Sequence, residues 1–193
     1  MHFSVNSVLN LNIRYILLSL AASFLLAACD SSDDKAAPVE IIELSSANID
    51  AFTVEIANDY LTTVDSLVTE FKKHKKANDA YGFTQYRNYY WTPAYIEKKD
   101  YYSAVIEKNR DFLSNSKIRP LFNKFDNLIY FGVDLKNSLL EKDRKLLDKT
   151  MAGLKQEKAD VIVVLKATGL VAEFKQFRKA NAAASAPLSI ISN

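Results

Sequence analysis

The feature that most constrains the fold is a long apolar stripe with helical spacing between residues 49 and 71. Its members recur at steps of three or four residues and are Ile49, Phe52, Ile56, Tyr60, Val64, Leu67 and Phe71. This spacing places them on one face of a helix. Ser45 or Ser46 is suited to cap the start, and the basic run Lys72–Lys76 complements the negative end of the helix dipole. The pattern predicts a helix from about Ser46 to Lys76.

Three more segments carry the same kind of spacing. Thr92-Pro93 resembles a helix start, with Thr as cap and Pro at the first helical position, and predicts a helix to about Asn115. Apolar residues that recur at intervals of nearly seven residues predict a long helix over 121–151, slightly bent at Gly132. A last helix is expected over 159–179, kinked at Gly169. Its β-branched run at 161–164 also fits a buried strand, but a single strand would lack a partner.

Composition agrees with a helical protein. Four glycines and four prolines in 193 residues argue against a loop-rich β architecture, and no internal repeat is present. The sequence therefore predicts an all-α fold: a single helical-bundle-like domain of four or five helices over 47–180. A flexible tail of small residues is expected over 181–193.

The beginning of the chain carries an apolar run over 15–28. A membrane-spanning helix needs about 20 apolar residues, and this run is shorter. The apolar run ends with two small residues, Ala27 and Ala28. Length and ending are typical of a cleaved secretory signal peptide over 1–28.

The four residues Leu26-Ala27-Ala28-Cys29 resemble the lipobox of bacterial lipoproteins, which is Leu, small, small, Cys. The resemblance implies that the chain is cut before Cys29, that this thiol carries a lipid, and that the protein is held on a membrane of the cell envelope, facing the periplasm. It is limited to the signal region. An ordinary secreted protein with a chance Cys29 is the alternative. Asp30 favours the inner membrane, and the outer membrane remains an alternative.

Small and charged residues follow Cys29. Together with that residue they predict a flexible tether over 29–46. Near its end Val39, Ile41, Ile42 and Leu44 alternate imperfectly with acidic residues. This short stretch fits either an extended arm lying on the domain or the first turn of a helix.

Charge excludes some partners. Beyond Glu43 the chain has 23 basic and 18 acidic side chains, an excess of +5. This is too small and too dispersed for a nucleic-acid binder. The run Lys72–Lys76 suggests contact with an anionic leaflet, but a solvated last helical turn is the favoured interpretation.

The sequence offers little catalytic chemistry. After cleavage the only histidine is His74, expected to be a solvated residue at a helix end, and Cys29 is the only cysteine. No zinc-binding spacing and no phosphate-binding glycine loop occurs in the sequence. We therefore expect no enzyme activity, no cofactor and no metal site.

The most unusual composition lies between residues 78 and 92, where six aromatic residues cluster. The candidate binding residues are Tyr86, Arg87, Tyr89, Tyr90 and Trp91. Tyr and Trp give large, rigid contact areas with a polar tip, which suits protein interfaces and stacking on sugar rings. The competing interpretation is that these rings fill the space between helices as core residues.

These features predict a lipid-anchored envelope protein whose helical domain binds another macromolecule, most simply a protein. An immunity or inhibitor role is suggested by architecture alone. The alternatives are a ligand-binding or cell-wall glycan-binding protein that uses the aromatic residues, and a cryptic carboxylate-based enzyme. An enclosed cavity lined by the aromatic rings would favour a ligand, whereas a flat exposed patch would favour a protein. The oligomeric state is left open.

Overall fold

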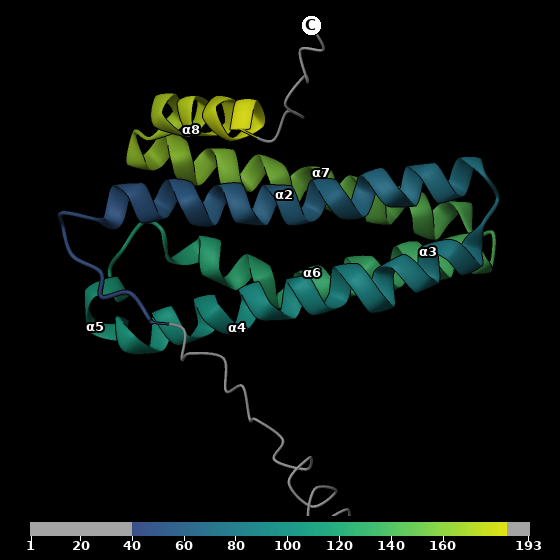
Figure 1. Cartoon of the computed structure of the whole chain (residues 1–193), viewed down its shortest axis with the longest axis horizontal. Helices are drawn as coiled ribbons and strands as arrows, with labels where there is room; N and C mark the ends of the chain where they lie inside the picture. Colours follow the sequence, from purple (N-terminus) through teal and green to yellow (C-terminus); the bar gives the residue numbers. More distant parts are fainter. Residues whose placement is uncertain (1–39, 185–193) are drawn as a thin grey trace, which may run out of the picture. The chain divides into compact units, whose positions relative to one another are not determined.

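The computed structural model describes residues 40–184, and this part of the chain is all-α (Figure 1). The predicted signal peptide, Cys29, Asp30 and the chain after residue 184 lie outside the described residues. The helices are α2 (Ile49–Lys76), α3 (Ala80–Tyr86), η2 (Arg87–Trp91), α4 (Thr92–Lys108), α5 (Arg110–Leu113), α6 (Arg119–Leu140), α7 (Arg144–Thr168) and α8 (Val171–Ala184). The structure confirms the prediction of an all-α, helical-bundle-like domain.

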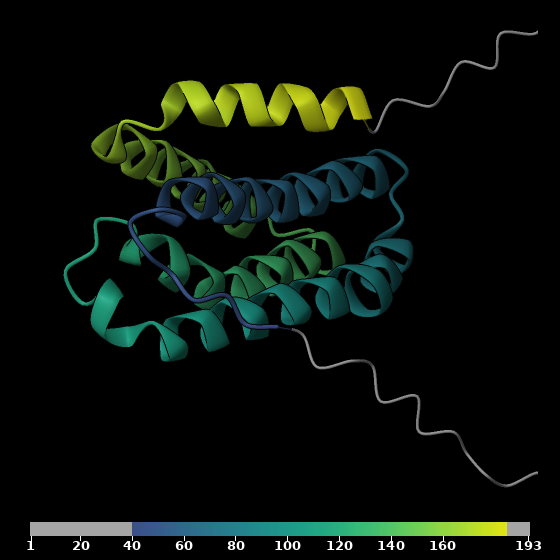
Figure 2. The same ribbon diagram turned by 60° about the vertical axis from the view of Figure 1, so that its left-hand side comes forward.

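The predicted stripe of α2 forms the centre of the core. Ile56, Val64 and Leu67 are fully buried, and Phe52 and Phe71 are nearly so. Helix α2 packs against α3, α6, α7 and α8, which explains why its apolar face is so wide. Figure 2 shows α8 on one side of α2 and α7, with α4 and α6 on the opposite side.

A cluster of aromatic rings connects α2, α4 and α6. Phe52 stacks on Phe122 with ring centroids 6.0 Å apart. Tyr102 lies 4.9 Å from Phe125, and Tyr60 meets the same ring edge-on at 5.3 Å. Rings at these separations attract beyond the effect of their burial alone. The phenylalanines of α6 therefore hold α2 and α4 together.

The single helix predicted over 121–151 is wrong, because α6 and α7 are separate antiparallel helices. The chain turns at Glu141–Asp143, where Lys142 adopts a positive φ of 55°. The carboxylate of Asp143 accepts a hydrogen bond from the backbone N–H of Leu146 at 2.9 Å and caps α7. The two helices then pack extensively against each other.

Residue Gly169 ends α7. Its φ of +79° is left-handed, and the N–H of Leu170 donates to the carbonyl of Leu165 at 2.9 Å. This is the usual glycine C-cap of a helix. The kink predicted here is thus a complete break between α7 and α8. The run at 161–164 is helical, as predicted.

Two segments at the predicted domain boundaries are ordered. Residues 41–44 lie as an extended arm against the end of α4, which is one of the two interpretations that the sequence left open: the N–H of Leu44 donates to Oδ1 of Asn109 at 2.7 Å. The amide of Asn109 also donates to the carbonyls of Ile42 and Val105. Helix α8 extends to Ala184, so the first residues of the predicted tail are helical.

Candidate functional site

The aromatic residues singled out from the sequence lie on one continuous helical segment formed by α3, η2 and α4. The middle part, η2, is a π-helix, in which the N–H of Thr92 donates to the carbonyl of Arg87 five residues earlier. Pro93 lacks an N–H, so the carbonyl of Tyr89 has no donor four residues ahead. Helix α4 begins at Thr92 with Pro93 in its first turn, as predicted, but it continues directly from η2, and the helix widens there to accommodate the proline. The Thr92 hydroxyl has no hydrogen-bond partner in the described part of the chain, so the predicted capping role of Thr92 is wrong.

Trp91 is a core residue and does not lie on a binding surface. Its side chain is only 3% exposed, and the indole Nε1–H donates to the carbonyl of Thr63 on α2 at 3.0 Å. The indole stacks on Tyr95 with centroids 5.2 Å apart and planes 4° from parallel. The Tyr95 hydroxyl in turn donates to the carbonyl of Phe125 at 2.6 Å, and burial raises the Tyr95 pKa to about 12. Trp91 thereby fixes η2 to α2.

Three of the candidate binding residues are tyrosines on the outside of the same segment. Tyr89 is 68% exposed and Tyr90 is 70% exposed. Tyr86 is half-buried and stacks on Tyr90, with centroids 6.3 Å apart and planes 18° from parallel. We call Tyr86, Tyr89 and Tyr90 the tyrosine surface.

The tyrosine surface borders a small hollow between the α3–α4 segment and α2. The hollow has a volume of about 180 Å³ and is lined by Thr62, Ser66, Tyr86, Tyr90 and Lys98, among others. Sites for drug-sized ligands usually measure roughly 300–1,000 Å³. The structure therefore brings Tyr86 and Tyr90 together at a shallow surface and not around an enclosed cavity.

Arg87 is less accessible than expected for a binding residue. Its Nη1 donates to Oδ1 of the neighbouring Asn88 at 2.8 Å, whereas Nε is buried and has no hydrogen-bond partner in the described part of the chain. Burial lowers the pKa of the Arg87 guanidinium. Its stem lies against α6, where a Cβ on Gly132 would come within 3.2 Å of Nε. Arg87 thus packs alongside Trp91 at the contact with α6.

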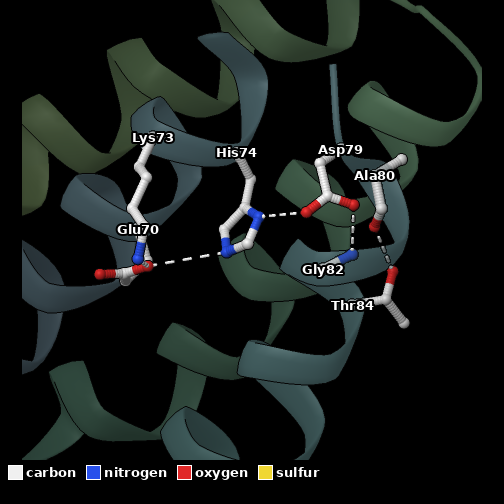
Figure 3. A network of polar contacts seen from close by, with 7 residues as sticks. All are labelled: Glu70, Lys73, His74, Asp79, Ala80, Gly82 and Thr84. Atoms are coloured by element: carbon white, nitrogen blue, oxygen red, sulfur yellow. Dashed lines mark hydrogen bonds and ion pairs between the residues drawn. The ribbon is translucent and has the colours of Figure 1, made fainter. Parts of the chain in front are cut away.

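The histidine predicted to be solvated is held between two carboxylates (Figure 3). The His74 side chain is 16% exposed, with Nδ1 2.9 Å from Oδ2 of Asp79 and Nε2 3.6 Å from Oε2 of Glu70. Asp79 also accepts a hydrogen bond from the backbone N–H of Gly82 at 2.8 Å, which caps α3. A side chain at Gly82 would collide with both Asp79 and His74. The network therefore fixes the corner between α2 and α3.

One signal in the sequence would have located part of this network. Asp79 precedes Gly82 by three residues, which is the spacing of a capping carboxylate and the N–H that it accepts. His74 is five residues before Asp79, so it meets the carboxylate only because the chain reverses direction between them. The side chain of Asn109, which fixes the arm, has no comparable signal in the sequence.

No family model matches this chain, and the searches of curated proteins and of solved structures also return no match. Among the described helices, none is long and apolar enough to cross a membrane. The same residues contain no group of three or more His, Cys, Asp or Glu side chains placed to hold a metal ion. The candidate site that remains is the tyrosine surface.

Proposed function

We propose that this chain is a lipid-anchored protein of the bacterial envelope whose helical domain binds a protein partner through the tyrosine surface. The observation that carries the proposal is the exposure of Tyr89 and Tyr90 on a segment that Trp91 fixes to the core. Large aromatic side chains on a rigid element lose little conformational entropy on binding, and tyrosine is enriched in protein interfaces.

The shape of the site favours a protein over a small ligand. The hollow beside Tyr86 and Tyr90 is smaller than the sites that enclose drug-sized molecules, whereas the exposed rings offer a shallow contact area. The polar groups at its edge already have partners inside the domain: the Ser66 hydroxyl donates to the carbonyl of Thr63 at 2.9 Å, and Lys98 pairs with Asp59 at 2.6 Å. A role as an inhibitor or immunity protein is the most specific form of the proposal.

The anchor in this proposal is the lipid on Cys29. Its support is the lipobox, Leu26-Ala27-Ala28-Cys29. Two or three acyl chains hold a protein on a bilayer far more firmly than one. Replacing Cys29 by Ser should move the protein from the membrane fraction to the soluble fraction after a high-salt wash. Retention in the washed membranes would contradict the anchor.

The binding surface is tested separately by Tyr89→Ala combined with Tyr90→Ala in the anchored protein. Both side chains are exposed, so we expect the double variant to fold normally and to lose its co-purifying partner after mild crosslinking. Val163→Ala is the matched control, because Val163 is also exposed (61%) but lies on α7. Equal recovery of the same partner with both variants would contradict the proposed surface.

A further inference from the structure

One end of the bundle carries most of the excess positive charge of the domain. It consists of residues 71–79 at the end of α2 and residues 140–149 around the turn between α6 and α7, and we call it the basic end. Its cations are Lys72, Lys73, Lys75, Lys76, Lys142, Arg144, Lys145 and Lys149, against four acidic residues. This excess of +4 compares with +5 for the whole chain beyond Glu43.

The fold brings these two distant segments together. Figure 1 shows the end of α2 and the turn between α6 and α7 at the same end of the bundle. Lys75 and Asn78 line one side of a hollow of about 440 Å³, and Lys142 and Arg144 line the other. The sequence run Lys72–Lys76 is therefore only half of a larger charged surface.

The cations of the basic end are exposed and largely unpaired. Lys73 forms an ion pair with Glu70 at 2.9 Å. In the described part of the chain, no carboxylate pairs with the other seven. In the middle of the bundle, by contrast, Lys124 is paired with Glu157 at 2.6 Å and with Asp160 at 3.0 Å. The charge at the basic end is thus available to a partner.

The helix dipoles explain the positions of only some of these cations. The lysines at the end of α2 face the negative end of that helix dipole, which is favourable. Arg144 and Lys145 occupy the first turn of α7, where the dipole is positive and cations are disfavoured. The helix dipole therefore does not explain the position of these two cations.

Two apolar side chains flank the basic end. Leu140 is 52% exposed at the end of α6, and Tyr81 is 73% exposed in the first turn of α3, just after the α2–α3 corner. Seven of the eight cations are lysines, which are depleted in protein interfaces. Lysines with an exposed tyrosine and leucine are typical of surfaces that contact lipid headgroups.

We propose that the basic end docks on the surface of a bilayer that contains anionic phospholipids. The lysines and Arg144 would lie at the phosphate groups, and Tyr81 and Leu140 would enter the headgroup region. The inference rests on the proposed function in one respect, namely that a lipid anchor keeps the domain close to a membrane. A linker of the length of residues 30–40 has a root-mean-square extension of roughly 20 Å, which keeps the domain as a whole close to the bilayer.

The test uses the full chain with Cys29→Ser, so that it contains no lipid anchor and is independent of lipidation. A single cysteine introduced at exposed Ala77 carries an environment-sensitive fluorophore, and a second protein carries it at Ala172 at the start of α8. The probes are vesicles of phosphatidylcholine alone and vesicles with phosphatidylglycerol added. We expect the label at position 77, and not the one at position 172, to brighten only with the anionic vesicles, and salt to reverse the change.

Matched charge variants complete the experiment. Neutralising the basic end with K75Q, K76Q, R144Q and K145Q should weaken vesicle binding about tenfold or more. The control K117Q, K155Q, K166Q and K175Q removes the same charge from exposed positions elsewhere and should leave binding within about twofold. Equal brightening with both vesicle types, or equal loss in both variants, would overturn the inference. Failure of the anchor would instead appear in the Cys29→Ser fractionation.

Discussion

The indole of Trp91 lies directly against the backbone of α6 at Gly132. A Cβ atom at residue 132 would lie only 3.0 Å from Cζ3 of Trp91. Together with the hydrogen bond from Trp91 to Thr63, this contact fixes η2 between α2 and α6. The exposed rings of Tyr89 and Tyr90 are therefore carried by one of the best anchored parts of the molecule.

Replacing Gly132 by Val should destabilise the domain. The added isopropyl group would displace the Trp91 indole from α6, and overpacking of this kind usually costs about 1–3 kcal/mol. The midpoint of urea unfolding is the measurement. Gly153→Val should also be destabilising, since a Cβ at Gly153 of α7 would lie 2.7 Å from Cε1 of Phe131 on α6. An unchanged midpoint for Gly132→Val would mean that Trp91 does not pack as described.

Truncating Trp91 should lower the stability of the domain far more than truncating Tyr89. Trp91→Ala removes a buried indole and its hydrogen bond, and we expect a loss of about 3–5 kcal/mol in the free energy of unfolding. Tyr89→Ala changes an exposed side chain and should alter stability by less than about 0.5 kcal/mol. Chemical denaturation followed by circular dichroism measures both. Similar losses in the two variants would contradict the division into core and surface.

Asn109 should control the arm that leads into the domain. Its side chain satisfies the backbone N–H of Leu44 and the carbonyl of Ile42. Asn109→Ala leaves buried backbone groups without these partners and should cost about 1–3 kcal/mol. We also expect faster proteolytic cleavage near residue 42, whereas cleavage elsewhere stays slow. If the rate of cleavage near residue 42 is the same in the variant and the wild type, the arm is held by other contacts.

Asp79 should make the α2–α3 corner sensitive to acid. The hydrogen bond from the N–H of Gly82, and then the one with His74, lower the pKa of this carboxyl. Because the pKa is lower in the folded state, the resulting stability is fully present above the unfolded-state pKa of about 3.9 and is lost as the pH falls through the folded-state value. Unfolding midpoints measured between about pH 6 and pH 3 should fall less steeply in Asp79→Asn than in the wild type. Asp100→Asn, at an exposed position on α4, is the control and should keep the wild-type slope.

The helical class and the main core stripe could be predicted, because the apolar period of α2 continues without interruption from Ile49 to Phe71. The turn between α6 and α7 could not. It contains no glycine or proline, and Lys142 adopts a left-handed conformation that favours Gly or Asn. The apolar repeat through Leu135, Leu139 and Leu146 also stays in phase across the turn and thereby conceals it.

The candidate site was predictable as a region and not residue by residue. The aromatic composition located the segment, but the π-helix adds one residue to a turn and rotates the following side chains relative to a regular helix. Helical spacing therefore could not separate buried Trp91 from exposed Tyr89 and Tyr90. Only one half of the basic end, the run Lys72–Lys76, could be recognised in the sequence, because the two halves are about seventy residues apart and meet only in the folded chain.

The central claim, that the tyrosine surface binds a protein, is tested most directly by photo-crosslinking in intact cells. A photoreactive residue is placed in turn at Tyr89 and Tyr90, with Val163 on α7 as the equally exposed control. The account predicts a discrete adduct of one mass from positions 89 and 90 and none from position 163. Folded, membrane-bound protein that gives no adduct from position 89 or 90, or the same adducts from all three positions, would contradict it.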